Sequence, residues 1–364
     1  MNPAPKSRAA LPAGIRLGPV YLRVRQLDRM LEFYSGLLDL FPSRAPIGTG
    51  GSSPGTAGAP SAAAAGPTRA AGDAGAAVWL AAAPGDPPLL CLEEASDAPP
   101  RPPRTTGLYH VALRYPRRAD LARAFLRLRE ARWPFQGFAD HGVSEAIYLA
   151  DPEGNGLELY ADRPRERWPR RNGGVAMYTA PLDLDGLVAA AARAAPDSVA
   201  TQPPPGGTRS SGDPAGGGAA PGSGGRAPVG GSADPAAGGE APAAEAVGPV
   251  VGHIHLQVSR LETAEAFYCG VLGFEVTQRD FPGALFVAAG GYHHHLGFNV
   301  WAGEDVPPPP RGAAGLAGLT IRLPGDADLQ AVLDRARAAG VSTDPSPRGW
   351  VMHDPDGNPV FLTV

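Results

Sequence analysis

The chain repeats itself, and this repeat constrains the fold more than any other feature of the sequence. The stretch "MLEFYSGLLDLF" at 30–41 recurs as "AEAFYCGVLGFE" at 264–275, and "LADPEGNGLELY" at 149–160 recurs as "MHDPDGNPVFLT" at 352–363. A short strand-like run precedes each "FY" block, and a strand followed by a helical pattern precedes each "DP-GN" block. Self-similarity of this kind indicates copies of one supersecondary unit.

Each copy is expected to contain a strand, a helix and about three further strands. In the second copy, Leu121, Phe125 and Leu128 follow the three- and four-residue spacing of one helix face. The "DPEGN" and "DPDGN" segments have turn chemistry, since Pro fixes φ and Gly or Asn accepts positive φ. The sequence therefore predicts four βαβββ units, at 15–95, 105–163, 249–302 and 313–364.

The expected fold class is α+β. One βαβββ unit cannot cover its own sheet, so the units are expected to pair into two curved-sheet modules with enclosed concavities.

Two segments interrupt this pattern. The 49 glycines and 42 prolines are concentrated in 45–76, inside the first unit, and in 203–246, within the linker 196–248. Both segments lack the aromatic and β-branched residues whose burial offsets the entropy of ordering. We expect both to be disordered and to carry no site.

Composition narrows the function classes. The net charge of −4 and the pI of about 6.1 disfavour electrostatic binding to nucleic acid. The Arg-rich stretch "RPRERWPRR" (163–171) is interpreted as a solvated connector. Cys91 and Cys269 have no paired spacing and are expected to be buried free thiols. The first residues lack a signal-peptide pattern, and no run approaches eighteen apolar residues, so a cytoplasmic protein without a membrane segment is expected.

Candidate metal ligands fall on equivalent strand positions. The second position of the first strand is His110 in the second unit and His253 in the third. Glu158 follows the "DPEGN" turn of the second unit. The other units have Pro19, Gly318 and Phe361 at these places, none of which can ligate.

Two imidazoles and one carboxylate leave several coordination positions open, as in the facial sites of non-haem Fe(II). The absence of thiolate argues against structural zinc. Taken singly, a strand His is more often a hydrogen-bonded core residue, and a lone Glu more often lies on a solvated face. The shared register is what favours a metal.

With these residues the sequence resembles the vicinal-oxygen-chelate superfamily, which includes glyoxalases, bleomycin-resistance proteins and extradiol dioxygenases. More closely it is similar to bacterial catechol 2,3-dioxygenases built from four βαβββ units. The "FY-G-LG" and "DP-GN" blocks are typical of the whole superfamily. The stretches 140–164 and "GGYHHHLGFNVW" (290–301) resemble the dioxygenase branch more specifically.

The resemblance implies an Fe(II) site, with Mn(II) as the other candidate ion, held by His110, Glu158 and His253. It implies an aromatic diol and O2 as substrates, and cleavage of the ring next to the hydroxyl pair. The family's catalytic residues map to His141 and Tyr148, which would bind substrate oxygens, and to His294, which would transfer a proton.

The histidine triplet is expected to lie in a buried strand. In that strand His293 and His295 would point to the face opposite His294. A shift of one residue would place His295 at the catalytic position instead.

The order of the donors constrains how the units pair. His110 and Glu158 lie in the second unit and His253 in the third, so a single site requires these two units to form the active module. The first and fourth units would then form a metal-free module. Pairing of the first unit with the second and of the third with the fourth would split the triad.

Two other functions stay open at this point. A glyoxalase-type isomerase or lyase usually has a fourth protein ligand, and the corresponding region around Phe298–Asn299 supplies no acid. A metal-free protein that sequesters a flat drug would lack the triad. The outer units could present a sheet edge or a helix face to a second copy, so a homo-oligomer is also open.

Overall fold

The computed structural model describes residues 10–44, 76–171, 174–194 and 248–364. The two segments expected to be disordered therefore lie almost entirely outside the described residues.

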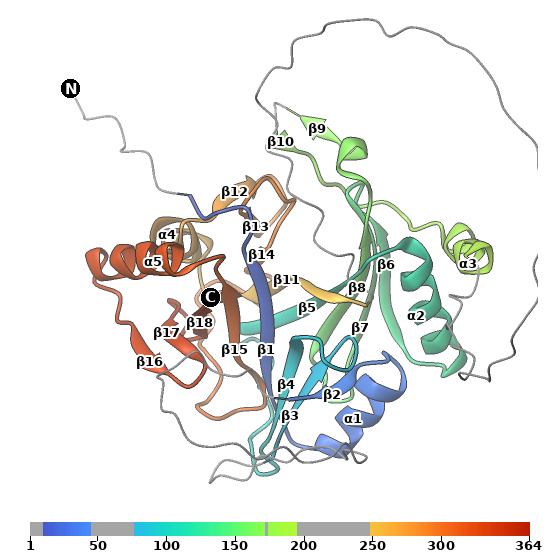
Figure 1. Cartoon of the computed structure of the whole chain (residues 1–364), viewed down its shortest axis with the longest axis horizontal. Coiled ribbons are helices and arrows are strands. Elements are labelled where there is room, and N and C mark those ends of the chain that lie inside the picture. The colour runs from blue at the N-terminus through green and yellow to red at the C-terminus, as the bar shows by residue number, and fades with distance from the viewer. Residues whose placement is uncertain (1–9, 45–75, 172–173, 195–247) are drawn as a thin grey trace, which may run out of the picture. The chain divides into compact units, whose positions relative to one another are not determined.

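The strand–helix–strands order of the first two repeats is as expected (Figure 1). The first unit contains β1 (Arg16–Val24), α1 (Leu27–Gly36), β2 (Phe41–Ser43), β3 (Ala77–Ala81) and β4 (Pro88–Glu94). The second contains β5 (Gly107–Tyr115), α2 (Arg118–Glu130), β6 (Phe135–Asp140), β7 (Ser144–Ala150) and β8 (Gly156–Asp162). After it come a 3₁₀ turn η1 (Arg165–Arg167), β9 (Arg170–Arg171), β10 (Gly174–Val175) and α3 (Leu184–Arg193).

The last two repeats follow the same order. The third contains β11 (Val250–Gln257), α4 (Leu261–Phe267), the π-helical turn η2 (Tyr268–Leu272), β12 (Glu275–Gln278), β13 (Ala284–Ala288) and β14 (Leu296–Asn299). The fourth contains β15 (Gly315–Arg322), α5 (Asp326–Ala338), β16 (Asp344–Ser346), β17 (Gly349–His353) and β18 (Pro359–Thr363).

The repeats pair out of sequence order into two eight-stranded sheets. Sheet A joins the first and fourth units in the order β16-β17-β18-β15-β1-β4-β3-β2. Sheet B joins the third and second in the order β12-β13-β14-β11-β5-β8-β7-β6. This confirms the expected α+β fold of paired modules. The pairing that brings His110, Glu158 and His253 into one sheet is the one adopted.

The two units of sheet B meet through the antiparallel strands β5 and β11. Each strand carries one extra residue relative to its partner. Val251 and His253 pair with Leu113 and Ala112, which leaves Gly252 without an opposite residue, and Tyr109 is left over in the same way on β5. Such bulges bend a strand and change which face a side chain occupies.

The repeated "FY" and "DP-GN" motifs hold consecutive units together. The hydroxyl of Tyr34 on α1 donates to Asp151 of the "DPEGN" turn at 3.0 Å, and Tyr268 donates to Asp354 of "DPDGN" at the same distance. All four residues are buried. The sheets therefore join the first unit to the fourth and the second to the third, whereas these buried hydrogen bonds join the first unit to the second and the third to the fourth.

The acidic residue at the third position of each turn strengthens the same junction. The Glu153 carboxylate accepts the backbone N–H groups of Arg25 and Gln26, each at 2.7 Å, just before α1. Asp356 accepts the N–H of Ser259 just before α4, at 3.1 Å. A carboxylate at a helix start satisfies N–H groups that lack a partner inside the helix.

The helices cover the sheets with apolar residues, as the spacing predicted. On α2, which packs against β5 and β8, Leu121, Phe125 and Leu128 are all buried. Cys91 and Cys269 are both buried and neither forms a disulfide, and burial raises the pKa of the Cys91 thiol to about 12. In the described part of the chain, no helix is long and apolar enough to cross a membrane.

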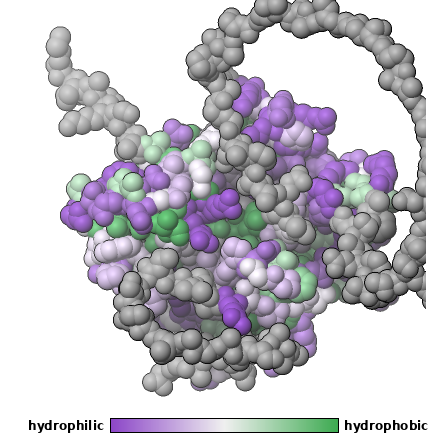
Figure 2. Space-filling view, viewed as in Figure 1, coloured by the Kyte–Doolittle hydropathy of each residue, from purple (hydrophilic) through white to green (hydrophobic). Residues whose placement is uncertain are grey.

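The Arg-rich connector has acidic partners. Arg163 bonds to Asp140 at 2.7 Å and to Glu145 at 3.1 Å, and Arg171 bonds to Asp280 at 2.6 Å. The surface over η1 and β9 is strongly hydrophilic (Figure 2). These contacts agree with a solvated connector.

The buried Tyr–Asp bonds yield a stability prediction. Tyr34→Phe and Tyr268→Phe each remove one donor and leave an Asp oxygen short of a partner, so each should lower the free energy of unfolding by about 1–2 kcal/mol. Urea unfolding of both variants would measure the loss. Tyr178→Phe, which removes a hydroxyl from an exposed side chain, is the matched control. Equal effects in all three variants would contradict the assigned role.

Candidate metal centre

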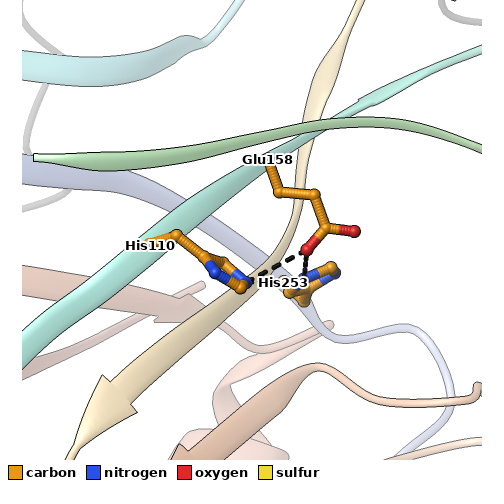
Figure 3. Close-up of side chains that lie close together, drawn as sticks. All are labelled: His110, Glu158 and His253. Carbon is orange, nitrogen blue, oxygen red and sulfur yellow. Dashed lines mark hydrogen bonds and ion pairs between the residues drawn. The ribbon is translucent and has the colours of Figure 1, made fainter. Parts of the chain in front are cut away.

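Strand register brings the three predicted ligands to one place on sheet B. Ala112 on β5 pairs with His253 on β11 on one side and with Glu158 on β8 on the other. His110 lies two residues from Ala112 and so points to the same face. The three side chains converge from three neighbouring strands (Figure 3).

Their ligand atoms have the spacing of a metal site. Glu158 Oε2 lies 3.0 Å from His253 Nε2 and 3.1 Å from His110 Nε2, and the two nitrogens are 3.3 Å apart. Three ligand atoms on one face of an octahedral ion, each about 2.1 Å from it, are about 3 Å apart. The donor set and its geometry therefore fit a divalent ion with open positions.

The electrostatics favour the protonation states that bind metal. Burial alone would raise the pKa of Glu158, but His253 and hydrogen bonds from both histidines outweigh it and hold that pKa well below its usual range. Burial lowers the pKa of His253 in spite of the nearby carboxylate. An ionised carboxylate and a neutral imidazole are the forms that ligate.

This triad is distinctive within the described ranges 10–44, 76–171, 174–194 and 248–364. There it is the one group of three or more His, Cys, Asp or Glu side chains whose ligand atoms all lie within 4.8 Å of one another. Each of the three residues is at most 5% exposed. Three buried polar side chains at this spacing are costly unless they are paired or ligating.

His141 and Tyr148 form a pair beside the triad. His141 lies between β6 and β7, and its Nε2 is 2.8 Å from the Tyr148 hydroxyl, while its Nδ1 is 2.9 Å from the carbonyl of Tyr178. Tyr148 pairs in register with Glu158, and its ring lies 5.8 Å from that of His110. Burial and the negative charge of Glu158 raise the pKa of Tyr148 well above its usual value, so it carries a proton.

The histidine triplet differs from the expectation in two ways. It lies in the bend that precedes β14, not in a strand, because β14 begins only at Leu296. His293 does not face away from His294, since their Nδ1 atoms are 2.8 Å apart. His295 does turn elsewhere, and its Nδ1 accepts the backbone N–H of Ala289 at 3.2 Å.

Of the three, His294 is the one that packs on the triad. Its ring centroid lies 4.1 Å from that of His253 and 5.0 Å from that of Phe286. Burial and the surrounding histidines hold the pKa of His294 well below its usual value. Its imidazole is therefore neutral.

A buried network that the sequence analysis did not identify supports His294 from behind. Asp162 lies 2.9 Å from His293 Nε2 and accepts the hydroxyl hydrogen of Tyr292 at 3.0 Å. The Tyr292 hydroxyl lies 2.8 Å from that of Tyr160, whose ring is 4.9 Å from the ring of His253. The network therefore connects His294, through His293, to the half-buried carboxylate of Asp162.

The place of a fourth protein ligand is empty of donors. Strands β5 and β11 pair symmetrically, since His110 on β5 pairs with His255 and His253 on β11 pairs with Ala112. His110 and His253 are therefore equivalent positions in the two units, and so are Ala112 and His255. Glu158 pairs with Ala112, so its counterpart is Gly297, which pairs with His255. A Cβ at Gly297 would lie 3.0 Å from the His255 ring. The position therefore offers no acid, in agreement with the sequence analysis.

The family model described as "Glyoxalase/Bleomycin resistance protein/Dioxygenase superfamily" matches residues 16–159 and 250–361. The chain belongs to this superfamily. The resemblance inferred from the repeats and the histidine motif is thereby confirmed.

Individual relatives agree with this assignment. The chain is 38% identical over 271 residues to the catechol-2,3-dioxygenase of Bacillus subtilis (strain 168), covering 73% of this chain and 78% of that protein. A shorter match is 43% identical over 68 residues to biphenyl-2,3-diol 1,2-dioxygenase 3 of Rhodococcus globerulus, covering 18% of this chain and 34% of that protein.

Solved structures share the fold. A putative dioxygenase from Bacillus subtilis subsp. subtilis str. 168 superimposes with a TM-score of 0.54 at 11% identity, over 97% of this chain and 86% of that one. Glyoxalase I from Zea mays gives a TM-score of 0.50 at 14% identity, over 96% and 92%. At these identities the similarity establishes the fold and leaves the chemistry to the site.

Removal of one ligand tests the centre. Glu158→Gln replaces an anionic donor with a neutral amide of similar size, and we expect metal affinity to fall on the order of 100-fold or more. Bound metal after anaerobic loading and desalting, measured by plasma emission, would report the change. His353→Gln, at an exposed histidine of sheet A, should retain full metal content. Full occupancy in the Glu158 variant would exclude this carboxylate as a ligand.

Proposed function

We propose that the protein is an extradiol ring-cleaving dioxygenase, which inserts both atoms of O2 into a catechol-type diol at a non-haem Fe(II) centre. The observation that carries the proposal is the convergence of His110 Nε2, His253 Nε2 and Glu158 Oε2 within 3.3 Å of one another. The relatives named catechol-2,3-dioxygenase and biphenyl-2,3-diol 1,2-dioxygenase support a dioxygenase.

The chain's own residues would divide the work as follows. His110, His253 and Glu158 would hold the ion, which when bound supplies a Lewis-acidic centre with open positions for diol and oxygen. Tyr148 and His141 would bind and orient the substrate oxygens through their hydrogen-bonded pair. The buried surroundings would exclude bulk water, which strengthens each of these polar contacts.

His294 is the proposed proton-transfer residue. Burial alone would raise the pKa of Asp162, but the hydrogen bond from His293 and other contacts outweigh burial and lower that pKa. The Asp162 carboxylate is therefore ionised and can only accept hydrogen bonds. His293 Nε2 would then donate to Asp162, and its Nδ1 would accept from His294 Nδ1. This arrangement leaves His294 Nε2 unprotonated, ready to take a proton from a diol hydroxyl.

The two alternatives are less well supported. A glyoxalase-type isomerase needs a fourth protein donor, and the corresponding position is Gly297. A metal-free drug-binding protein has no use for a buried triad with the spacing of metal ligands. A cytoplasmic location and assembly into a homo-oligomer belong to the same proposal, and the choice between iron and manganese is left to the assay.

Oxygen consumption separates these functions. The Fe(II)-loaded protein should consume O2 in proportion to catechol and form a yellow ring-cleaved product, and a chelator should abolish both signals until Fe(II) is restored. Loading with Mn(II) in parallel identifies the active ion. Metal-dependent turnover of a hemithioacetal without O2 uptake would instead support the isomerase. Binding of a flat drug by a protein that takes up no metal would support the sequestering function.

The assignment within the histidine triplet has its own test. His294→Asn should lower kcat by about 10²–10⁴-fold, because it removes the general acid–base group while the metal ligands remain. His295→Asn makes the same chemical change one residue away and should alter kcat only a few-fold. Metal content and circular dichroism of both variants confirm that the site and fold persist. If the His295 variant is the one that loses activity, the assignment must shift by one residue.

A further inference from the structure

Two exposed aromatic side chains stand next to the buried triad. Tyr109 is 39% exposed and Trp301 is 45% exposed. Their ring centroids lie 5.2 Å apart with the planes at 77°. Both rings also contact the buried ring of His255, at 5.1 and 5.4 Å, and Tyr109 lies 5.2 Å from His110. The pair therefore forms a partly exposed rim beside a metal-ligating residue.

A bulge is what brings Tyr109 to this side. Simple alternation along β5 would put Tyr109 on the face opposite His110. Tyr109 is the extra residue in the β5–β11 pairing, since His110 pairs with His255 while Leu108 pairs with Leu256. The bulge turns two consecutive side chains toward the same region.

The fold itself does not require an aromatic residue at this bulge. The same bulge occurs at the equivalent place on the other three central strands. There the residues outside the pairing are Gly252 on β11, Ala317 on β15, and Gly18 with Pro19 on β1, none of which carries an aromatic ring. At Gly252 a Cβ would lie 1.9 Å from the Tyr160 hydroxyl, so that copy excludes any side chain. Only this described copy carries a large ring, and that ring remains partly exposed. A packing role does not account for it.

Trp301 is held in a fixed position rather than lying loosely on the surface. Its indole N–H donates to the carbonyl of Pro282 at 3.0 Å, and its backbone N–H donates to the Asn299 side chain at 3.2 Å. The ring of Phe281 lies 6.2 Å away. An ordered, exposed indole presents apolar area at a small entropic cost on binding.

We propose that Tyr109 and Trp301 form the wall that binds a planar apolar substituent on the diol ring, so that aryl-substituted catechols are preferred over catechol. The proposal rests on the dioxygenase function proposed above. Rings at near right angles offer a face and an edge, the two contacts that aromatic groups favour. The ring neighbours of the pair are His110, His255 and Phe281, which suit an apolar substituent better than a carboxylate.

The test measures binding and turnover separately on the Fe(II)-loaded full chain. Anaerobic calorimetry gives Kd for 3-phenylcatechol and for catechol, and oxygen uptake gives kcat/KM for the same two diols. We expect Tyr109→Ala and Trp301→Ala each to weaken binding and kcat/KM for 3-phenylcatechol by roughly 10-fold, with less than about threefold change for catechol. Tyr109→Phe should keep the preference because it keeps the ring.

The control is Phe41→Ala, which removes a ring of similar exposure (43%) on β2 of sheet A, and it should change neither quantity. Equal losses for both diols in the rim variants, or a wild-type protein that prefers catechol in both assays, would overturn the proposal. An anaerobic binding preference without oxygen uptake would uphold the rim and defeat the dioxygenase function. If Trp301→Ala elutes from gel filtration as a smaller species than the wild-type protein and keeps its diol preference, the rim is instead a contact between two copies of the chain.

Discussion

The antiparallel pairing of β5 with β11 is the interaction on which the site depends. It is the only junction between the second and third units within sheet B, and it sets His253 opposite Ala112 and His255 opposite His110. A slip of one residue would send every side chain of one strand to the other face. The two bulges fix the register, because each absorbs one extra residue at a defined place. Backbone pairing therefore positions the three proposed metal ligands before any ion binds.

Sheet A shows what the same architecture does without ligands. Its central strands β1 and β15 pair with the same two bulges, but Pro19 and Gly318 stand where sheet B has the two histidines. Phe361 and Cys91 stand at the Glu158 and Gly297 positions, and the rings of Tyr21 and Phe361 pack at 5.2 Å. An apolar cluster thus fills the space. One sheet stabilises the chain by burial, and this leaves the other free to carry buried polar groups that cost stability.

The repeat unit and the candidate ligands could be predicted from the sequence, because both depend on regular patterns along the chain. Repeats reveal the unit, and strand alternation then places His110, Glu158 and His253 on one face without any knowledge of the fold. Alternation along β8 also extends from Glu158 to Tyr160 and Asp162, so the network behind His294 carried a readable signal. The position of Tyr109 could not be predicted in this way, because a bulge interrupts the alternation of side chains along β5. The histidine triplet was assigned to a strand for its apolar flanks, but its imidazoles bond to Asp162 and to the Ala289 backbone, which a regular ladder would not allow.

The repeated motifs join units that do not share a sheet. Tyr34–Asp151 and Tyr268–Asp354 tie each unit to its neighbour in sequence, whereas the sheets tie the second unit to the third and the first to the fourth. Each unit is thus held by one partner through a sheet and by another through a buried hydrogen bond, and the four form a closed ring of contacts. In such a ring no single unit can leave without breaking both a sheet and a buried hydrogen bond. Because the ligands come from two units, the integrity of the metal site depends on all four junctions, including those of the sheet that carries no ligand.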